Sequence, residues 1–509
     1  MNGAATVTDV CLVLEGTYPY VAGGVSTWTH DLIRGLSHLS FHILTLMPPG
    51  ADLTRRYELP ANVVAVTPVT LQRLARGRRR VRGQRRLLAS LRAPIEDLVR
   101  GGGAPALARI MDIIAPRRDD LGQDVLLDSR EAWQLLVDMY SDTYHETSFL
   151  DYFWSWRALM GGLFSLVVAP LPRARVYHTV STGYAGLLAA RARLETGRPA
   201  IVTEHGIYTN ERRIEIAMAD WLFELPLVGL GIDRPALDLK DFWIAAFEGY
   251  SRACYDACDE IITLYEGNQA FQIADGADPA KLAVVPNGID FPRFSALDHV
   301  REGRPPTIAL IGRVVPIKDV KSFIRAVARL RETVPELRAL VMGPTEEDEE
   351  YYAECVAMVE HLGLGETLSF TGRVRLDDYL GAIDVIVLTS ISEAQPLVLL
   401  EAGAVGIPSV ATDVGSCKEI LFGRSDESPP LGPAGAVVRL SDPEATAQAV
   451  ARLLLEPDWY AQASAAIRER VRCYYQERDV MVAYGDRYAR YMAQPDGTPS
   501  SPARDEEVA

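Results

Sequence analysis

The sequence has no long uninterrupted apolar run. Its longest apolar stretch, residues 158–172, is broken by Gly161, Gly162 and Pro170. A helix needs about 20 consecutive apolar residues to cross a bilayer, so this stretch predicts buried core rather than a membrane span. The first ten residues include Asp9 but no lysine or arginine. They lack the basic segment with which a signal peptide begins.

Cysteine is scarce, with six in 509 residues. Cys254 and Cys258 stand four apart in a helical pattern, but no second Cys pair or His pair accompanies them. A structural zinc site needs four such ligands, so we expect buried reduced thiols here. Reduced thiols together with the missing signal segment predict a cytoplasmic location, since disulfides belong to oxidising compartments.

Positive charge is also in deficit, with 52 Lys and Arg against 68 Asp and Glu and a net charge of −16. This balance argues against a nucleic-acid partner. Residues 71–92 are the exception, because they contain no acid and interleave leucines with arginines. The stretch holds nine arginines, at positions 73, 76, 78, 79, 80, 82, 85, 86 and 92. Two interpretations stay open: a solvated or partly disordered insertion, or docking of 73–92 to an anionic membrane surface or an acidic partner.

Short apolar runs alternate with helical patterns in both halves of the chain. The predicted strands are 9–14, 41–46, 63–66, 176–180, 200–204, 260–264 and 282–285, then 307–311, 337–342, 368–370, 385–389, 409–411 and 436–439. Such alternation is typical of parallel sheets covered by helices on both faces. A chain of 509 residues is too long for one ordinary core and suits two large domains. We therefore predict an α/β protein with two Rossmann-like, doubly wound domains.

Two motifs in the second half carry chemistry. Glu393 and Glu401 have seven residues between them, and Gly312-Arg313 with Lys318 lies upstream, after a predicted strand. Carboxylates accept several hydrogen bonds from sugar hydroxyls. A guanidinium binds a diphosphate through two hydrogen bonds and an ammonium adds a compact charge. Strand ends and helix N-termini in parallel sheets collect anions. Together the motifs predict a nucleotide-sugar site.

On these motifs the chain resembles the retaining family-4 glycosyltransferases of GT-B fold, over most of residues 8–492. The resemblance implies two Rossmann-like domains facing a cleft. It implies that Arg313 and Lys318 hold the donor diphosphate and stabilise charge as the glycosidic bond breaks. It also implies that Glu393 orients the donor hexose and that Glu401 accepts hydrogen bonds from the ribose hydroxyls.

The resemblance also implies domain limits. Residues 1–295 are the acceptor-side domain, with a helical insertion at about 71–160, and the Asn-Gly turn at 287–288 begins the linker. Residues 296–468 bind the nucleotide sugar. A helix at 469–492 crosses back to the first domain, and the Pro-, Ser- and acid-rich tail 493–509 is expected to be disordered.

Further site residues follow from the resemblance. Gly23 and Gly24 are expected beside the donor phosphate and the acceptor, where glycine lets a ligand approach the backbone. His205, after another predicted strand, matches the histidine that faces the hexose. The remaining donor-binding residues expected are Gly312, Gln395, Leu397 and Val398, together with Arg373 and Val374, which are expected to lie against the base.

Two departures from the family pattern bear on the donor. Many members have Phe-Gly where this chain has Gln395-Pro396, and proline lacks the N–H that would face the hexose. We expect the Gln395 side-chain amide to replace it. Starch and glycogen synthases carry Lys-x-Gly-Gly, whereas this chain has Val21 before Gly23-Gly24, which argues against ADP-glucose.

No Asp-x-Asp motif ends a predicted strand. The Arg313 and Lys318 pair is expected to neutralise the diphosphate without Mg²⁺, so we expect no metal or other cofactor and activity that survives EDTA.

The opening segment 15–26, the Gln395-Pro396 variant and the long insertion are similar to the PelF-type family of Pel exopolysaccharide systems. This similarity implies transfer of a hexose from UDP-glucose or UDP-N-acetylhexosamine to a growing polysaccharide in biofilm matrix synthesis. It also implies inner-membrane partners, contacted through 73–92, and peripheral attachment at the inner membrane. Two alternatives stay open: a UDP-sugar epimerase of GT-B architecture, and a non-catalytic nucleotide-sugar-binding scaffold.

Overall fold

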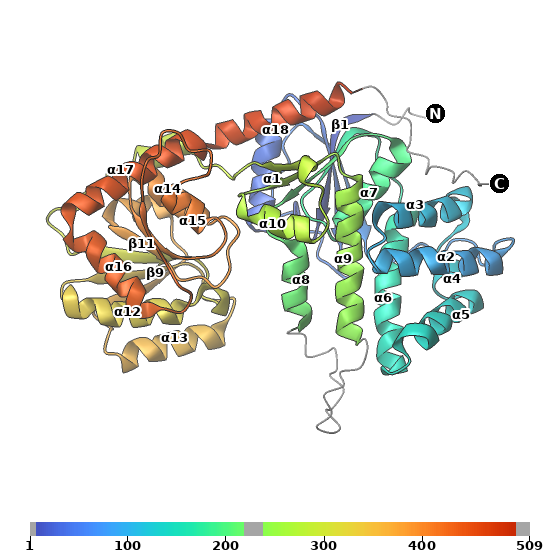
Figure 1. Cartoon of the computed structure of the whole chain (residues 1–509), viewed down its shortest axis with the longest axis horizontal. Coiled ribbons are helices and arrows are strands. Elements are labelled where there is room, and N and C mark those ends of the chain that lie inside the picture. The colour runs from blue at the N-terminus through green and yellow to red at the C-terminus, as the bar shows by residue number, and fades with distance from the viewer. Residues whose placement is uncertain (1–6, 218–237, 495–509) are drawn as a thin grey trace. The chain divides into compact units, whose positions relative to one another are not determined.

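The structure is a computed structural model that describes residues 7–217 and 238–494. Most of the tail predicted at 493–509 lies outside the described residues. The chain divides into two compact units. Unit 1 comprises Met1–Thr263, Gln269–Ala283 and Tyr484–Ala509, and unit 2 comprises Leu264–Asn268 and Val284–Ala483. Each unit is built around its own sheet (Figure 1).

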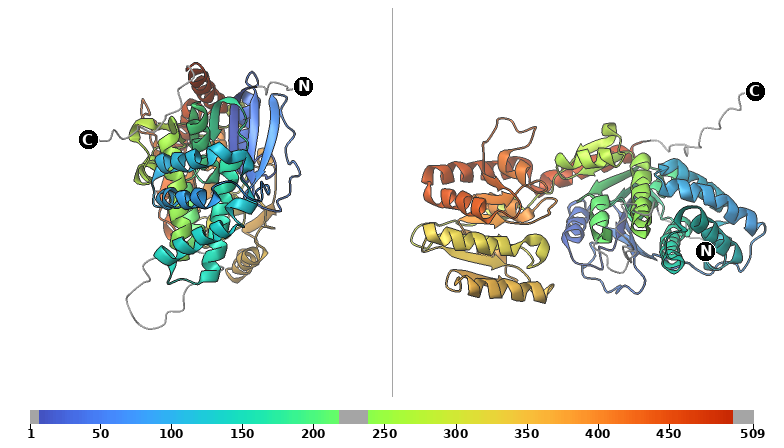
Figure 2. Two further views of the ribbon diagram at one scale, coloured as in Figure 1. Left: turned by 90° about the vertical axis from the view of Figure 1, so that its right-hand side faces the viewer. Right: turned by 60° about the horizontal axis from the view of Figure 1, so that its bottom comes forward.

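Unit 1 contains a seven-stranded sheet in the order β3-β2-β1-β4-β5-β6-β7. Its strands are β1 (Thr8–Glu15), β2 (Phe41–Met47), β3 (Val63–Thr70), β4 (Ala174–Thr179), β5 (Ala200–Glu204), β6 (Glu260–Thr263) and β7 (Leu282–Val284). Strands β1 to β6 pair in parallel, and the blue strands β1–β3 lie side by side in the left-hand view of Figure 2. Val10 to Leu14 are at most 1% exposed, which explains the continuous apolar sequence of β1.

Helices of unit 1 connect these strands. They are α1 (Gly24–Gly35), α7 (Tyr184–Thr196), α8 (Tyr208–Ala217), α9 (Leu239–Ala257) and α10 (Gly267–Ala274). Cys254 of α9 and Cys258 are buried, and their sulfur atoms lie 3.7 Å apart as free thiols. The prediction of buried reduced thiols is confirmed.

Between β3 and β4 the chain forms a group of helices. They are α2 (Gln84–Val99), α3 (Gly103–Ile114), η1 (Ala115–Asp120), α4 (Gln123–Leu126), α5 (Arg130–Met139), η2 (Tyr140–Tyr144) and α6 (Phe149–Val168). They cover one side of unit 1 (Figure 1). Helix α6 holds most of the longest apolar stretch, and Leu159, Met160, Leu163 and Phe164 are buried, as predicted for core. In the described part of the chain no helix is long and apolar enough to cross a membrane.

The structure corrects one interpretation of the arginine-rich stretch. Its arginines are exposed except Arg92, which confirms that they are solvated. The expectation of partial disorder is wrong, because the interleaved leucines pack into the core of unit 1 and anchor the stretch. The buried leucines are Leu71, Leu74, Leu87, Leu88 and Leu91. Burial of these side chains outweighs the charge repulsion among the arginines, which keep their guanidinium groups in water.

Unit 2 contains a six-stranded parallel sheet in the order β10-β9-β8-β11-β12-β13. Its strands are β8 (Thr307–Ile311), β9 (Arg338–Met342), β10 (Leu368–Gly372), β11 (Val385–Leu388), β12 (Ser409–Thr412) and β13 (Gly435–Val438). Val385 and Val387 point into one core cluster, whereas Ile386 and Leu388 point into another. This alternation places a separate core on each face of the sheet.

The helices of unit 2 cover both faces. They are α11 (Phe291–Ser295), α12 (Val320–Thr333), α13 (Glu349–His361), α14 (Leu397–Val405), α15 (Cys417–Phe422), α16 (Pro443–Leu455) and α17 (Pro457–Tyr474), with short 3-10 turns η4 (Pro316–Lys318), η5 (Leu376–Asp378) and η6 (Leu380–Ala382). The 3-10 turn η3 (Pro279–Lys281) belongs to unit 1. The last helix, α18 (Glu477–Met492), begins in unit 2 and ends in unit 1. There the Tyr488 hydroxyl lies 2.6 Å from His178 Nδ1 and the Tyr484 hydroxyl lies 3.0 Å from Thr203 Oγ1.

Candidate functional site

The strand order of unit 2 reverses between β8 and β11. From β8 the chain proceeds outward through β9 and β10, and it then returns to place β11 on the other side of β8. Ligands of open parallel sheets bind beside the carboxyl ends of the strands at such a switch point. Gly312 and Arg313 follow β8 and Glu393 follows β11. The topology therefore brings the two predicted motifs to the same edge of the sheet.

Lys318 and Glu393 form an ion pair at this edge. The Lys318 Nζ of turn η4 donates to Glu393 Oε1, and the two side chains are only 20% and 13% exposed. The Ser390 hydroxyl donates to the same carboxylate oxygen at 2.6 Å. The alkyl chain of Lys318 lies beside Gly312, because a Cβ added there would lie 3.5 Å from Lys318 Cε. The site thus holds a positive charge and a hydrogen-bonding carboxylate at one strand end.

Backbone contacts fix the two loops that carry this pair. The Thr389 hydroxyl donates to the carbonyl oxygens of Lys318 and Asp319 at 3.0 and 2.9 Å. The Ile391 amide donates to the Ile317 carbonyl at 2.8 Å. Because these hydrogen bonds join the two loops, they fix the distance between the backbone positions of Lys318 and Glu393.

Two glycines allow neighbouring loops to approach the site. Gly343 has φ +151°, and a Cβ there would lie 2.0 Å from the Gly312 carbonyl oxygen. Gly415 has φ +54°, and a Cβ there would lie 2.3 Å from the carbonyl oxygens of Glu393 and Ala394. A side chain at either position would clash with backbone and would be strained by its φ. Sequence reasoning did not identify these two glycines as part of the site.

Gln395 is held by one end of its amide. Its Oε1 accepts a hydrogen bond from the Asn287 backbone N at 2.7 Å. Its Nε2 is buried and has no hydrogen-bond partner among residues 7–217 and 238–494. A buried unpaired amide donor is unfavourable, so an additional acceptor at this position would be stabilising. Pro396 follows as the residue before α14.

Glu401 lies on α14 with its pKa raised to about 7. Burial raises it, Arg293 opposes the shift and Asp377 adds to it. Arg293 is itself paired with Asp377, Nη2 to Oδ2, at 2.7 Å. Glu401 is thus a carboxyl group whose charge changes near neutral pH.

The other predicted residues of unit 2 are placed as follows. Arg313 Nη1 pairs with Glu347 Oε2 at 2.9 Å, and Arg373 Nη2 with Glu346 Oε1 at 3.6 Å, all four side chains being exposed. Exposed pairs of this kind contribute about 0–1 kcal/mol, so a diphosphate would displace the carboxylates readily. Val374 and Val398 pack partly buried against the core, while Leu397 is 37% exposed.

Gly23 and Gly24 begin α1, directly after β1 and its following turn. Both are exposed, and a Cβ added at either would meet no atom within 4 Å. Gly23 has φ 166°, which is extended backbone that any residue adopts. The fold of unit 1 therefore does not itself require glycine at either position, and close approach of a ligand would be a reason for it.

His205 follows β5 and contacts Trp28 of α1 edge-on, with ring centroids 4.6 Å apart. Both ring nitrogens are buried and have no hydrogen-bond partner in the described part of the chain. Burial lowers the pKa of His205 to about 4, so the ring is neutral at pH 7. A neutral imidazole with free nitrogens is suited to hydrogen bonding with a sugar hydroxyl.

Two buried carboxyl groups at strand ends of unit 1 were not predicted. Glu15, at the end of β1, accepts from the Tyr208 hydroxyl at 2.9 Å, and burial raises its pKa. Glu204, at the end of β5, accepts from Tyr255 at 2.7 Å and from Gln272 at 2.8 Å. Burial raises the pKa of Glu204 to about 7. The sequence pattern that could have identified these two residues is a glutamate at the end of an otherwise apolar strand.

Within 7–217 and 238–494, no three His, Cys, Asp or Glu side chains are grouped so as to hold a metal ion.

Two different family models match the two parts of the chain, and the gap between the matches lies near the boundary between the units. Residues 8–280 match the family model "Domain of unknown function (DUF3492)", and residues 305–456 match "Glycosyl transferases group 1". D-inositol 3-phosphate glycosyltransferase 2 of Catenulispora acidiphila is 34% identical over 220 residues. The match covers 40% of this chain and 49% of that protein, so the chain spans about half the length of this relative.

Two solved structures resemble the whole chain in fold. Sucrose-phosphate synthase of Thermosynechococcus elongatus has a TM-score of 0.57 at 15% identity, covering 95% of this chain and 99% of that one. HepE of Anabaena in complex with UDP has a TM-score of 0.55 at 13% identity, covering 94% and 99%. These likenesses and the two parallel sheets confirm the predicted GT-B fold class.

Proposed function

Since the chain belongs to the DUF3492 family and carries a group 1 glycosyl transferase domain, we propose that it is a retaining hexosyltransferase that uses a nucleotide-sugar donor. The observation that supports this most is the Lys318 and Glu393 ion pair beside Gly312 at the switch point of unit 2. A donor diphosphate needs a cation at a strand end, and the donor sugar needs a carboxylate beside it.

In the proposed reaction Lys318 and Arg313 bind the diphosphate and stabilise its charge as the bond to the sugar breaks. Both cations are already paired with glutamates, Glu393 and Glu347, which the diphosphate would displace or share. Glu393, released from Lys318, would accept hydrogen bonds from the hexose. Glu401 would accept from the ribose, and His205 would contact the hexose from unit 1. The two cations would make a metal unnecessary.

We propose UDP as the nucleotide and glucose or N-acetylhexosamine as the sugar. HepE, which shares the fold, was solved with UDP. Residues Arg373 and Val374 follow β10, where backbone groups are available to a base. The free Nε2 of Gln395 would supply the donor that Pro396 cannot.

We further propose that the acceptor is a growing polysaccharide of a PelF-type exopolysaccharide system. The protein would work in the cytoplasm, beside inner-membrane partners, with residues 73–92 as the contact. The exposed arginines of this stretch support that part of the proposal.

The test is a thermal-shift screen with UDP, ADP and GDP, followed by a UDP-release assay with UDP-glucose and UDP-N-acetylglucosamine. We expect a shift with UDP above the others, and UDP release that persists in EDTA. An epimerised sugar without acceptor would favour the epimerase alternative. UDP binding without UDP release from either donor, with polysaccharide acceptors supplied, would favour the scaffold.

A further inference from the structure

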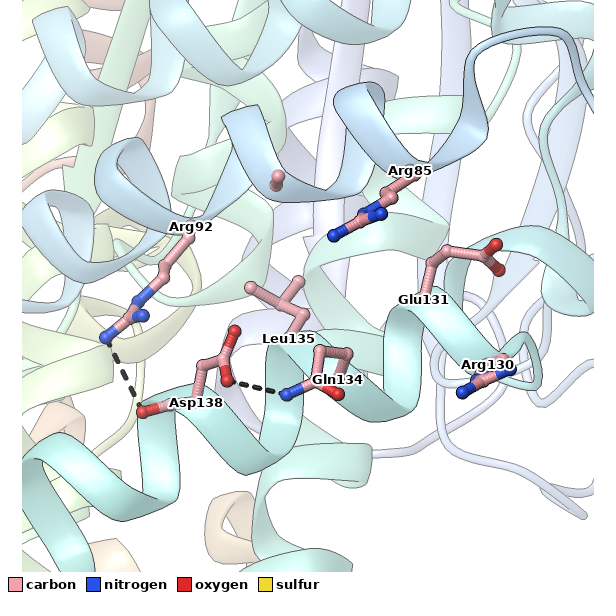
Figure 3. A pocket seen from close by; sticks show the side chains of 8 residues that line it. Arg85, Arg92, Arg130, Glu131, Gln134, Leu135 and Asp138 are labelled. Carbon is pink, nitrogen blue, oxygen red and sulfur yellow. Dashed lines mark hydrogen bonds between the residues drawn. The ribbon is translucent and has the colours of Figure 1, made fainter.

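Helices α2 and α5 of the insertion enclose a groove of about 750 Å³ on the surface of unit 1 (Figure 3). The residues that line it are Arg85, Ala89, Arg92, Arg130, Glu131, Gln134, Leu135 and Asp138. Arg85 and Arg130 lie toward one end in Figure 3, and Arg92 and Asp138 toward the other. Ala89 and Leu135 supply the apolar part of the lining.

The acidic side chains of the groove are already engaged. Glu131 Oε2 accepts from Gln84 Nε2 at 2.8 Å, and Asp138 Oδ1 accepts from Gln134 Nε2 at 2.8 Å. Arg92 is paired with Glu96 and Asp142. The groove's acids and one of its three arginines thus have partners in the fold.

Arg85 and Arg130 make no ion pair or hydrogen bond with any described residue. They belong to a wider group of exposed arginines that form no ion pair within the described ranges: 73, 76, 79, 80, 82, 85, 86 and 130. Like charges gathered on one surface repel one another, which raises the free energy of the isolated fold. An anionic partner would relieve this repulsion, and arginine is a residue enriched at protein interfaces.

The shape and lining of the groove distinguish between a lipid bilayer, a small anion and a helix as its partner. Leu71, Leu74, Leu87, Leu88 and Leu91 are buried in the core, so no leucine of this stretch is left to enter a bilayer. The groove volume of about 750 Å³ is much larger than a single phosphate ion, which would leave most of the groove unfilled. A recess between two helices, with Ala89 in its wall and the unpaired Arg85 and Arg130 at one end, fits a third helix.

We propose that the α2–α5 groove binds an acidic amphipathic helix of a partner protein. Small apolar residues of that helix would pack on the exposed Ala89, and its carboxylates would pair with Arg85 and Arg130. The site is in unit 1 and shares no residue with the donor site of unit 2, so it stands whether or not the proposed transfer reaction does.

The test uses a fluorescein-labelled amphipathic peptide of Glu, Ala and Leu, about 18 residues or five helical turns long. Fluorescence anisotropy should show binding that weakens with salt, and a peptide with Gln in place of Glu should not bind. The double variant R85E/R130E should lose about tenfold or more in affinity, since two attractive pairs become repulsive. R79E/R80E is the matched control, because it changes the same charge in the same stretch outside the groove.

The control should keep its affinity within about threefold, because Arg79 and Arg80 do not line the groove and exposed charges are screened by salt. Equal losses of peptide affinity in the two double variants would show nonspecific electrostatic attraction and would overturn the proposal that the groove is the binding site. Absence of peptide binding, with retention on phosphatidylglycerol vesicles that R85E/R130E abolishes, would assign the surface to lipid instead. UDP thermal shifts should be unchanged in both variants, which separates this result from the donor site. If R85E/R130E does not fold, R85Q/R130Q should still lose peptide affinity, and retained affinity would contradict the proposal.

Discussion

The Lys318 ammonium forms an ion pair with the Glu393 carboxylate, although the two residues are 75 positions apart in the sequence. Lys318 belongs to the turn after β8 and Glu393 to the loop after β11. The pair is mostly shielded from water and also receives the Ser390 hydroxyl. It places the two kinds of group that a sugar diphosphate needs at one point of unit 2.

Replacing Lys318 with alanine should weaken UDP binding, because a partly buried cation facing the diphosphate would be lost. We expect a loss of about 2–5 kcal/mol in binding free energy, measured by isothermal titration calorimetry. Lys321→Ala is the matched control, since Lys321 pairs with Glu354 on the neighbouring helices α12 and α13. Equal UDP affinities in the two variants would contradict the proposed role of Lys318.

UDP affinity should increase as pH rises through 7, because Glu401 has its pKa raised to about 7 and its ionised form accepts hydrogen bonds better. Glu401→Gln should remove the part of this pH dependence that Glu401 causes. The remaining dependence in the variant belongs to the UDP phosphate itself. We expect a difference of about tenfold or less between pH 6 and pH 8, measured by titration calorimetry. Parallel pH profiles for the two proteins would show that Glu401 does not contact the ligand.

Gly415→Ala should destabilise unit 2 and reduce UDP binding. Its φ of +54° disfavours any side chain, and the added Cβ would lie 2.3 Å from the Glu393 carbonyl. Gly363→Ala has a similar φ of +62° but open space around the Cβ. The control should therefore show only the backbone penalty of about 1–2 kcal/mol, without loss of UDP affinity. A UDP affinity as high in G415A as in G363A would mean that the position of the Glu393 loop does not affect UDP binding.

Glu204 should make the protein less stable as pH rises. Its pKa is raised from 4.5 to about 7 in the folded state, so between these values the folded chain binds a proton that the unfolded chain has released. The free energy of unfolding therefore falls from about pH 4.5 to pH 7 on account of this group, by about 1–3 kcal/mol. Glu204→Gln keeps the shape and removes the charge, so its melting temperature should decline less between pH 5.5 and pH 8. An unchanged decline would contradict a raised pKa at Glu204.

The sequence predicted the fold well because strands and helices show as patterns among residues that are near one another in the chain. Buried strands such as 9–14 and 385–389 show as short apolar runs, and the alternation with helical patterns implies parallel sheets wherever it occurs. The order of the motifs also predicted the edge of the sheet at which Lys318 and Glu393 form their ion pair. The roles of these residues toward a donor remain predictions.

Contacts between residues that are far apart in the sequence could not be predicted from local patterns. Glu204 is joined to Tyr255 and Gln272, which are 51 and 68 residues away, and no periodicity indicates such a network. The pairing of Arg313 with Glu347 is likewise a contact between two strand ends. The arginine-rich stretch shows the same limit, since its composition suggested disorder while burial of its leucines made it ordered.

The sequence by itself determined which segments become strands and helices, and which polar residues follow the strands, because these depend on side-chain period and on neighbours within a few residues. Only the tertiary structure decided which of those polar residues are partners, which carboxyl groups lose their solvent, and which arginines remain unpaired. Ion pairing, desolvation and groove shape depend on groups that are close in space and distant along the chain, and only the packed fold brings them together.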